Sequence, residues 1–154
     1  MNKIYTDGGA VPNPGAGGYG IFSNELNLKL YNSFENVTNN QMELLAVIVA
    51  YKYLLENNIS EKTIIITDSQ YVVNGINVWK KNWKLKNWKD VKNKELWILL
   101  DQLESKLSTV SVEWIKGHNG HEGNEMADEL ATIGVKEKKS QKIIDYINQN
   151  FTNI

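Results

Sequence analysis

The sequence contains no cysteine, and all 17 of its basic residues are lysine. Without cysteine, neither a disulfide nor a thiolate zinc site can stabilise the fold. Without arginine, no guanidinium group can hold a phosphate through two parallel hydrogen bonds. Only two of the 154 residues are proline, and 42% are hydrophobic. This composition is typical of a folded globular protein and excludes a disordered chain.

Long apolar segments are also missing. The first residues, Met1–Asp7, lack the apolar core of a secretion signal, and no later run is long and apolar enough to span a bilayer. We therefore expect a cytoplasmic protein that has no membrane partner. A length of 154 residues predicts one compact domain.

Excess positive charge is confined to one short segment. Residues 79–97 contain seven lysines and two acidic residues, whereas residues 1–78 and residues 98–154 each carry a net charge of −3. Within this segment Trp79 and Trp83 are one helical turn apart. Lysines could contact nucleic-acid phosphates while the tryptophans offer flat surfaces to sugars and bases. Taken alone, the pattern is more typical of a lysine-coated helix with tryptophans in the core.

The order of the predicted elements indicates an α/β domain. Residues 3–6, 18–23 and 28–34 are expected to form an antiparallel meander. The other expected elements are a helix at 40–56, a strand at 63–67, helices at 69–75 and 94–107, a strand at 110–115, and helices at 123–135 and 140–151. The strand at 63–67 is a continuous β-branched run, which predicts a central position with both faces buried.

Gly15–Gly20 matches the G-x-G-x-x-G pattern of dinucleotide-binding proteins. That pattern requires a strand before it and a helix that begins at its end. Here the glycines lead into an expected strand. A hairpin in which backbones approach closely is the better interpretation.

Four acidic residues lie at element ends or on helices near them: Asp7, Glu43, Asp68 and Asp128. Each has an ordinary alternative, namely a turn at Asp7, a capping box of Asn40 with Glu43, a helix cap at Asp68 and a solvated helix residue at Asp128. Together, however, the four could converge at one edge of a sheet. Such a cluster persists only if cations occupy it or some carboxylates stay protonated. Oxygen ligands favour Mg²⁺ or Mn²⁺, and two ions about 4 Å apart support phosphodiester cleavage.

Five sequence blocks resemble, in the same order, the signature blocks of type 1 ribonuclease H. They are Thr6–Gly9, Asn13–Gly20, Thr38–Leu44, Thr67–Val72 and Lys116–Ala131. The resemblance implies a five-stranded mixed sheet, antiparallel over its first three strands and flanked by helices. It implies a catalytic domain at residues 1–135, and we expect residues 136–154 to be a helical tail of that domain.

The resemblance also implies an activity and a metal site. The activity is hydrolysis of the RNA strand of RNA–DNA hybrids by a monomer with two Mg²⁺ ions, for which Mn²⁺ could substitute, leaving 5′-phosphate and 3′-hydroxyl ends. The metal ligands would be Asp7, Glu43, Asp68 and Asp128. His118 would assist proton transfer or product release, whereas His121 matches a structural position.

Substrate-binding positions follow from the same resemblance. Asn13, Asn40 and Gln70 match amides that contact the minor groove, and Thr38 matches a phosphate-binding position. The segment Trp79–Lys94 resembles the basic handle of bacterial and some eukaryotic members. Its expected substrate contacts are Trp79, Lys80, Lys81, Trp83, Lys84 and Lys86. Binding is the better interpretation of this segment beside the nuclease blocks.

Three features depart from the family pattern. Residues 36–38 lack the basic residue that many members supply to the phosphate pocket, the handle is shorter than in the best-known bacterial form, and the tail after Val135 matches no block. Two alternatives remain open. One is another nuclease or strand-transfer enzyme of the same fold, such as a retroviral ribonuclease H domain or a transposase, and the other is a hybrid-binding module without catalysis. The four acidic residues and the Gly-His-x-Gly loop favour the cellular enzyme.

Overall fold

A five-stranded mixed sheet with the strand order β3-β2-β1-β4-β5 forms the centre of the computed structural model, which describes residues 1–152. Strands β1 to β3 are antiparallel, and β4 and β5 run parallel to β1. The strands are β1 (Asn2–Val11), β2 (Gly15–Ser23), β3 (Leu28–Val37), β4 (Thr63–Thr67) and β5 (Val110–Trp114). The predicted fold class is confirmed.

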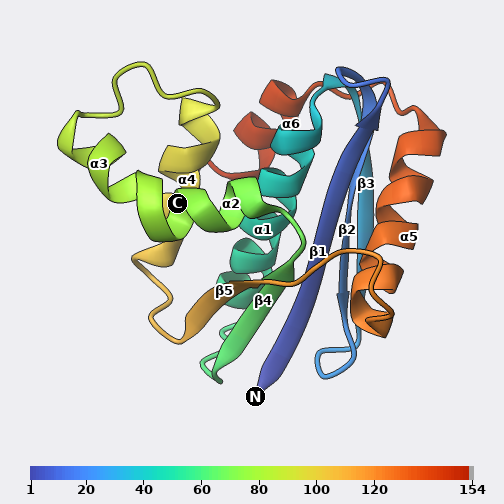
Figure 1. The fold of residues 1–154 in the computed structure, drawn as a ribbon, viewed down its shortest axis with the longest axis horizontal. Helices are drawn as coiled ribbons and strands as arrows, with labels where there is room; N and C mark the ends of the chain where they lie inside the picture. Colours follow the sequence, from blue (N-terminus) through green and yellow to red (C-terminus); the bar gives the residue numbers. More distant parts are fainter. Residues whose placement is uncertain (153–154) are drawn as a thin grey trace.

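Helices cover both faces of this sheet. Figure 1 shows α1 and α5 on opposite sides of the first three strands. The helices are α1 (Asn39–Glu56), α2 (Gln70–Asn74), the π-helix η1 (Gly75–Trp79), α3 (Lys80–Leu85), α4 (Lys94–Glu104), α5 (Glu122–Glu137) and α6 (Ile143–Asn150). Within residues 1–152, none of them combines the length and the apolar character that crossing a membrane requires.

Helix α1 is the centre of the hydrophobic core. Sequence periodicity predicted one apolar stripe, but its apolar residues from Met42 to Leu54 are buried around most of the circumference. The helix lies between the sheet and α4, whose Trp97 is fully buried. A helix that is apolar on all sides is stable only in such a position, because every face needs a covering partner.

Strand β1 is longer than predicted and occupies the middle of the sheet. It continues through Asp7, and Gly8 and Gly9 pair with Tyr19 and Gly18 of β2. The expectation that the strand at 63–67 would be central is confirmed, since β4 is an interior strand that pairs with β1 on one side and β5 on the other. The predicted end of β1 was too early because Asp-Gly-Gly is typical of a turn, whereas here cross-strand pairing keeps the chain extended.

The helix expected at 69–75 continues to Leu85 through α2, η1 and α3. The π-helical turn begins at Gly75, where a side chain would overlap the ring of Trp97. Such turns are uncommon and often occur near functional sites. This continuous helix carries the first half of the handle away from the sheet (Figure 1).

The tail folds back onto the edge strand β3. The backbone N–H of Glu35 donates to the carbonyl of Gln141 at 2.9 Å, and that of Lys139 donates to the hydroxyl of Ser33 at 2.9 Å. Tyr146 of α6 packs edge-on against Phe34, with ring centres 5.2 Å apart. The connection between α5 and α6 thus covers an edge whose backbone groups would otherwise be open to pairing with another chain.

Candidate active site

Asp7 lies within β1 and is buried with an exposed fraction of 7%. It is opposite Gly20 in the β1–β2 ladder, and its Oδ1 accepts the N–H of Gly8 at 2.9 Å. The interpretation of Asp7 as a turn residue is therefore wrong. A carboxylate this deeply buried needs a charged partner or a proton.

Glu43 reaches Asp7 because α1 packs unusually close to β1. A side chain at Gly8 would come within 2.6 Å of the backbone nitrogen of Glu43. The capping box of α1 is formed by Thr38 and Gln41, so the alternative of Asn40 with Glu43 is wrong. Glu43 is consequently free of a capping role, and its buried Oε1 has no hydrogen-bond partner among residues 1–152.

Asp68 is the first residue after β4. The cap of α2 is Ser69, whose hydroxyl accepts the N–H of Val72 at 3.2 Å, so Asp68 is not the helix cap. Parallel strands β1 and β4 bring Asp68 to the same region as Asp7, because Thr6 is opposite Thr67. Its carboxylate is half-buried.

Asp128 is positioned by the close contact between α5 and β2. A side chain at Gly20 would overlap the carbonyl of Ala127, and Gly20 is itself paired with Asp7. The next residue of α5, Asp128, is half-buried and adds to the charge around Asp7. Two small residues thus place the fourth acid beside the first.

The structure brings three of the four acids into one group. Oxygen atoms of Asp7, Glu43 and Asp68 lie within 4.8 Å of one another, and Asp128 is at the margin of this group. Burial, followed by the charge of Asp68, raises the pKa of Asp7 to about 8. Burial and the charges of Asp7 and Asp68 also raise the pKa of Glu43 well above its ordinary value. Crowded carboxylates with an unpartnered buried oxygen fit a divalent cation, which would offset this repulsion.

The two histidines have different positions in the connection between β5 and α5. His118 is exposed in the loop, with a left-handed backbone (φ 54°). His121 immediately precedes α5, and its carbonyl accepts the N–H of Glu125 at 3.0 Å. Figure 1 shows this connection passing in front of β4 and β1. The residue before His118, Gly117, lies against Asp68, so this loop begins beside the acids.

The predicted amide residues are available at the surface. Asn13, Asn40 and Gln70 are all exposed. Asn13 also accepts the N–H of Asn39 at 3.0 Å, which ties the β1–β2 turn to the start of α1. Thr38, at the N-cap of α1, is half-buried. Asn13, Thr38 and Asn40 thus lie at the start of the helix that carries Glu43, whereas Gln70 begins α2.

The handle lysines are not equivalent. Lys80 forms ion pairs with Asp101 at 2.8 Å and Glu104 at 2.9 Å, and its side chain is only 14% exposed. Lys84 lies 3.2 Å from Asp101 but is 51% exposed, whereas Lys81 and Lys86 have no carboxylate within 4.0 Å in the described part of the chain. Lys80 thus points toward α4, which sequence reasoning missed because Asp101 and Glu104 are more than 20 residues away.

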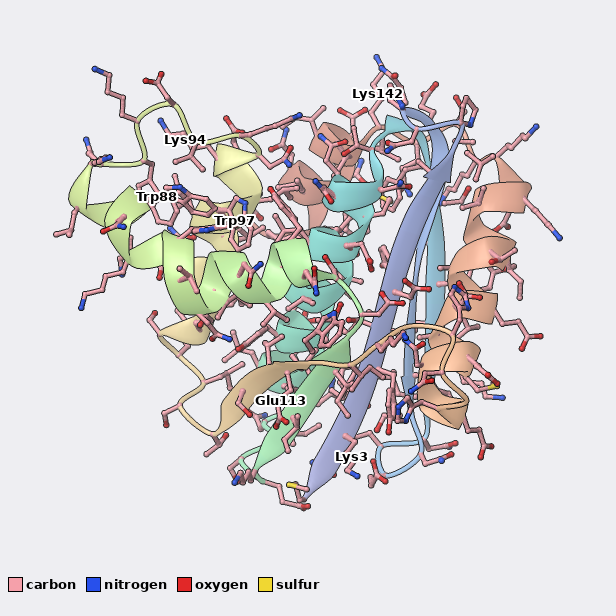
Figure 2. All side chains as sticks on the ribbon, viewed as in Figure 1. Lys3, Trp88, Lys94, Trp97, Glu113 and Lys142 are labelled. Atoms are coloured by element: carbon pink, nitrogen blue, oxygen red, sulfur yellow. The ribbon has the colours of Figure 1, made fainter. Side chains whose placement is uncertain are left out.

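The handle tryptophans belong to a series of aromatic contacts that extends from the core. Trp83 packs against the buried Trp97 with ring centres 5.1 Å apart, and Trp79 is 5.9 Å from Trp83 and 38% exposed. Tyr71, which sequence analysis did not single out, accepts the indole N–H of Trp97 at 2.9 Å. Figure 2 shows Trp97 lying between α4 and the helix that leads into the handle. Only Trp79 presents much of its ring to solvent.

Comparisons with known proteins agree with this geometry. A sequence model of the RNase H family matches residues 2–136. The chain is 45% identical to "Ribonuclease H" of Ruthia magnifica subsp. Calyptogena magnifica over 144 residues, covering 88% of this chain and 97% of the relative. It is 47% identical to "Ribonuclease H" of Pseudoalteromonas translucida over 136 residues, covering 84% and 86%.

Solved structures show the same fold. LC9-RNase H1, described as a type 1 RNase H with the type 2 active-site motif, superimposes with a TM-score of 0.77 at 26% identity, covering 90% of this chain and 73% of that one. A foamy viral protease-reverse transcriptase in complex with dsDNA gives a TM-score of 0.75 at 26% identity, covering 88% and 94%. Fold and sequence together define an endoribonuclease, an enzyme that hydrolyses phosphodiester bonds. The chain belongs to the RNase H family.

Proposed function

We propose that this enzyme cleaves the RNA strand of RNA–DNA hybrids with the help of two divalent cations, leaving 5′-phosphate and 3′-hydroxyl ends. The observation that carries the proposal is the group of Asp7, Glu43 and Asp68 oxygens within 4.8 Å of one another. Carboxylates this close are the ligands that Mg²⁺ and Mn²⁺ prefer. The names of the relatives supply the reaction class.

Asp7, Glu43 and Asp68 would hold the ions, with Asp128 completing the site at its margin. Ions held there would supply activation of a water molecule and stabilisation of the leaving 3′ oxygen. The chain itself orients the carboxylates through β1, α1, β4 and α5. His118, exposed in the loop beside them, accepts or delivers a proton at the edge of the site or eases product release.

Substrate recognition is assigned to two surfaces. Exposed amides of Asn13, Asn40 and Gln70 reach the minor groove, where they distinguish RNA by its 2′-hydroxyls, and Thr38 binds a phosphate. In the handle, Lys81, Lys84 and Lys86 contact phosphates and Trp79 contacts a sugar or base. Lys80 and Trp83 were expected to contact substrate as well. Instead, we assign both residues to holding the handle against α4, because Lys80 is ion-paired there and Trp83 packs on Trp97.

Cleavage of defined substrates tests the proposal. A labelled RNA–DNA hybrid, double-stranded RNA, double-stranded DNA and single-stranded RNA are each incubated with Mg²⁺ and with a chelator. The hybrid alone should be cut, in its RNA strand and only with Mg²⁺. Activity that survives the chelator, or that prefers another substrate, would contradict the proposal. Binding of the hybrid without cleavage would favour the alternative of a non-catalytic module.

The remaining assignments belong to the same proposal. Residues 1–135 form the catalytic domain of a cytoplasmic monomer, and residues 136–154 form its helical tail. The contacts of Gln141 and Tyr146 with β3 support one folding unit, although the last two residues of the tail lie outside the described ones. The four acidic residues and the Gly-His-x-Gly loop favour this enzyme over a retroviral domain or a transposase.

A further inference from the structure

Trp114 occupies a position that hydrophobic burial does not explain. It ends the edge strand β5, and 43% of its surface is exposed. Trp97 is buried, and Trp83 and Trp88 pack against the core, but Trp114 does not belong to the core cluster of the described residues. Its indole N–H instead donates to the backbone carbonyl of Asp68 at 3.0 Å.

That bond holds the backbone of Asp68 at the point where regular pairing ends. The last β4–β5 pair is Thr67 with Trp114, so the Asp68 carbonyl lies one residue beyond the ladder. On the same side, the N–H of Ile115 donates to the carbonyl of Thr67 at 3.0 Å. The indole therefore extends the β4–β5 connection by one further hydrogen bond, to the backbone of a proposed metal ligand.

Gly117 leaves room for the side chain of Asp68. A side chain on Gly117 would place its first carbon 2.5 Å from Oδ2 of Asp68, a separation too short for unbonded atoms. By contrast, a side-chain carbon added to Gly120 in the same loop would have no atom within 4 Å. The carboxylate of Asp68 therefore occupies space that only glycine at residue 117 leaves open.

We propose that Trp114 and Gly117 are positioning residues for Asp68, so that the affinity of the acidic group for a divalent cation depends on the end of β5 as well as on the ligands. The inference rests on the proposed function of that group. Carboxyl oxygens of Asp7, Glu43 and Asp68 are crowded within 4.8 Å of one another, and a held backbone with a fitted side-chain space keeps the Asp68 carboxylate in this group before a cation binds. Partners that orient metal ligands typically contribute 10- to 100-fold in metal affinity or activity, by an order-of-magnitude measure.

The same geometry connects the metal site to His118. Gly117, where an added Cβ would overlap the Asp68 carboxylate, is the residue immediately before His118. A displacement of the loop therefore moves a proposed ligand and a proposed proton carrier together. We expect substitutions at Gly117 to change both metal dependence and the pH profile of cleavage.

Mn²⁺ binding to the free enzyme, measured by calorimetry, tests the inference without substrate. Trp114→Phe keeps an aromatic ring but removes the N–H donor, and Gly117→Ala displaces the carboxylate. Both should raise the Kd for Mn²⁺ by about 10- to 100-fold, while the melting temperature in chelator stays close to that of the wild type. High Mg²⁺ should restore most of the kcat of Trp114→Phe.

Matched controls separate positioning from general damage. Trp88→Phe loses an indole elsewhere, and Gly120→Ala strains the same loop at a left-handed position (φ 78°) without touching Asp68. Neither control should change Mn²⁺ affinity. Wild-type Mn²⁺ affinity in both Trp114→Phe and Gly117→Ala, with binding lost in Asp68→Asn, would overturn the inference and leave the proposed metal site intact. Wild-type affinity in Asp68→Asn would overturn both.

Discussion

Individual carboxylates carry the chemistry that we propose, and their surroundings explain why they are present. Asp7 is buried, and Glu43 has an oxygen without a hydrogen-bond partner in residues 1–152. Neither arrangement stabilises the fold in the absence of a cation, because buried like charges repel. Residues that cost stability in this way are typical of functional sites.

Neutralising one acid should therefore separate activity from stability. Asp7→Asn or Asp68→Asn removes a ligand and relieves repulsion, so cleavage should be abolished while the melting temperature in chelator stays equal or rises. Hybrid cleavage and thermal unfolding check the two halves. Asp128→Asn, at the margin of the group, should retain some activity with Mn²⁺. A large loss of melting temperature in Asp7→Asn would instead assign that residue a structural role.

His118 should be an auxiliary residue, because the proposed chemistry depends on the ions. His118→Ala should lower kcat by about 10²- to 10⁴-fold, as expected for assistance by a general acid or base, and leave KM nearly constant. Steady-state kinetics on one hybrid at saturating Mg²⁺ measure this. His121→Ala is the control, since His121 is the N-cap of α5 and its carbonyl accepts the N–H of Glu125. An equal loss in both variants would show that loop structure was being measured.

At the scale of elements, the handle combines a binding surface with a packed base. Trp83, Trp97 and Tyr71 form its aromatic base, and Lys80 joins it to α4 through two carboxylates. Substrate binding then falls to the lysines that project outward. The segment's charge is thus divided between holding the handle in place and contacting phosphate.

Removing the outward lysines should weaken hybrid binding in a salt-dependent manner. The triple variant Lys81→Gln, Lys84→Gln and Lys86→Gln should raise KM, change kcat little, and reduce the salt slope of binding by up to about three, since each phosphate contact contributes about 0.9. A triple glutamine variant of Lys3, Lys62 and Lys106 is the control. Figure 2 shows Lys3 at the end of the molecule opposite Lys94. If both triple variants showed the same salt slope of binding, the handle would be only a solvated helix face and not a binding surface.

Helix α6 should contribute to global stability through Tyr146. Its ring packs on Phe34, and its hydroxyl lies 3.1 Å from that of Tyr19. Because Tyr146 is only half-buried, Tyr146→Ala should cost about 1 to 3 kcal/mol, less than a fully buried aromatic. Urea unfolding measures this free-energy cost. Ile144→Ala is the control, because 52% of the Ile144 surface is exposed. Equal stability of the two variants would contradict the assignment of the tail to the same folding unit.

At the scale of the whole molecule, the acidic group makes metal-free stability depend on pH. The pKa of Asp7 is near 3.8 in the unfolded chain, and burial and the charge of Asp68 raise this pKa to about 8 in the folded protein. Between these values the folded protein keeps a proton that the unfolded chain has lost. The free energy of unfolding in chelator should therefore fall as pH rises from about 4 to 8, with Glu43 acting in the same direction.

Divalent cations should reverse this trend. Bound Mg²⁺ takes the place of the proton, so its stabilising effect should be larger at pH 8 than at pH 5. Urea unfolding across this pH range, with Mg²⁺ and with chelator, checks both statements. Asp7→Asn should flatten the metal-free profile. A wild-type stability in chelator that rises steadily from pH 4 to 8 would contradict the assigned titrations.

The sequence by itself determined which chemistry is present. Acidic residues in short, ordered blocks indicated the enzyme class, because metal-dependent cleavage requires particular residue types beside particular turns and helix starts. Alternation and 3.6-residue periodicity located every strand and most helices, and the β-branched run at 63–67 matched β4 residue for residue. These signals are local, so they can be read along the chain.

Only the tertiary structure decided how those residues are used. Pairing with β2 carried β1 straight through Asp7, and the Thr38–Gln41 capping box left Glu43 free for the acidic group. Lys80 forms ion pairs with Asp101 and Glu104 and is therefore largely buried. The indole of Trp114 donates to the backbone carbonyl of Asp68, 46 residues earlier, and Gly117 in the following loop leaves room for the Asp68 carboxylate. Each outcome depends on contacts between residues that are distant in sequence, and such contacts form only when the elements pack together.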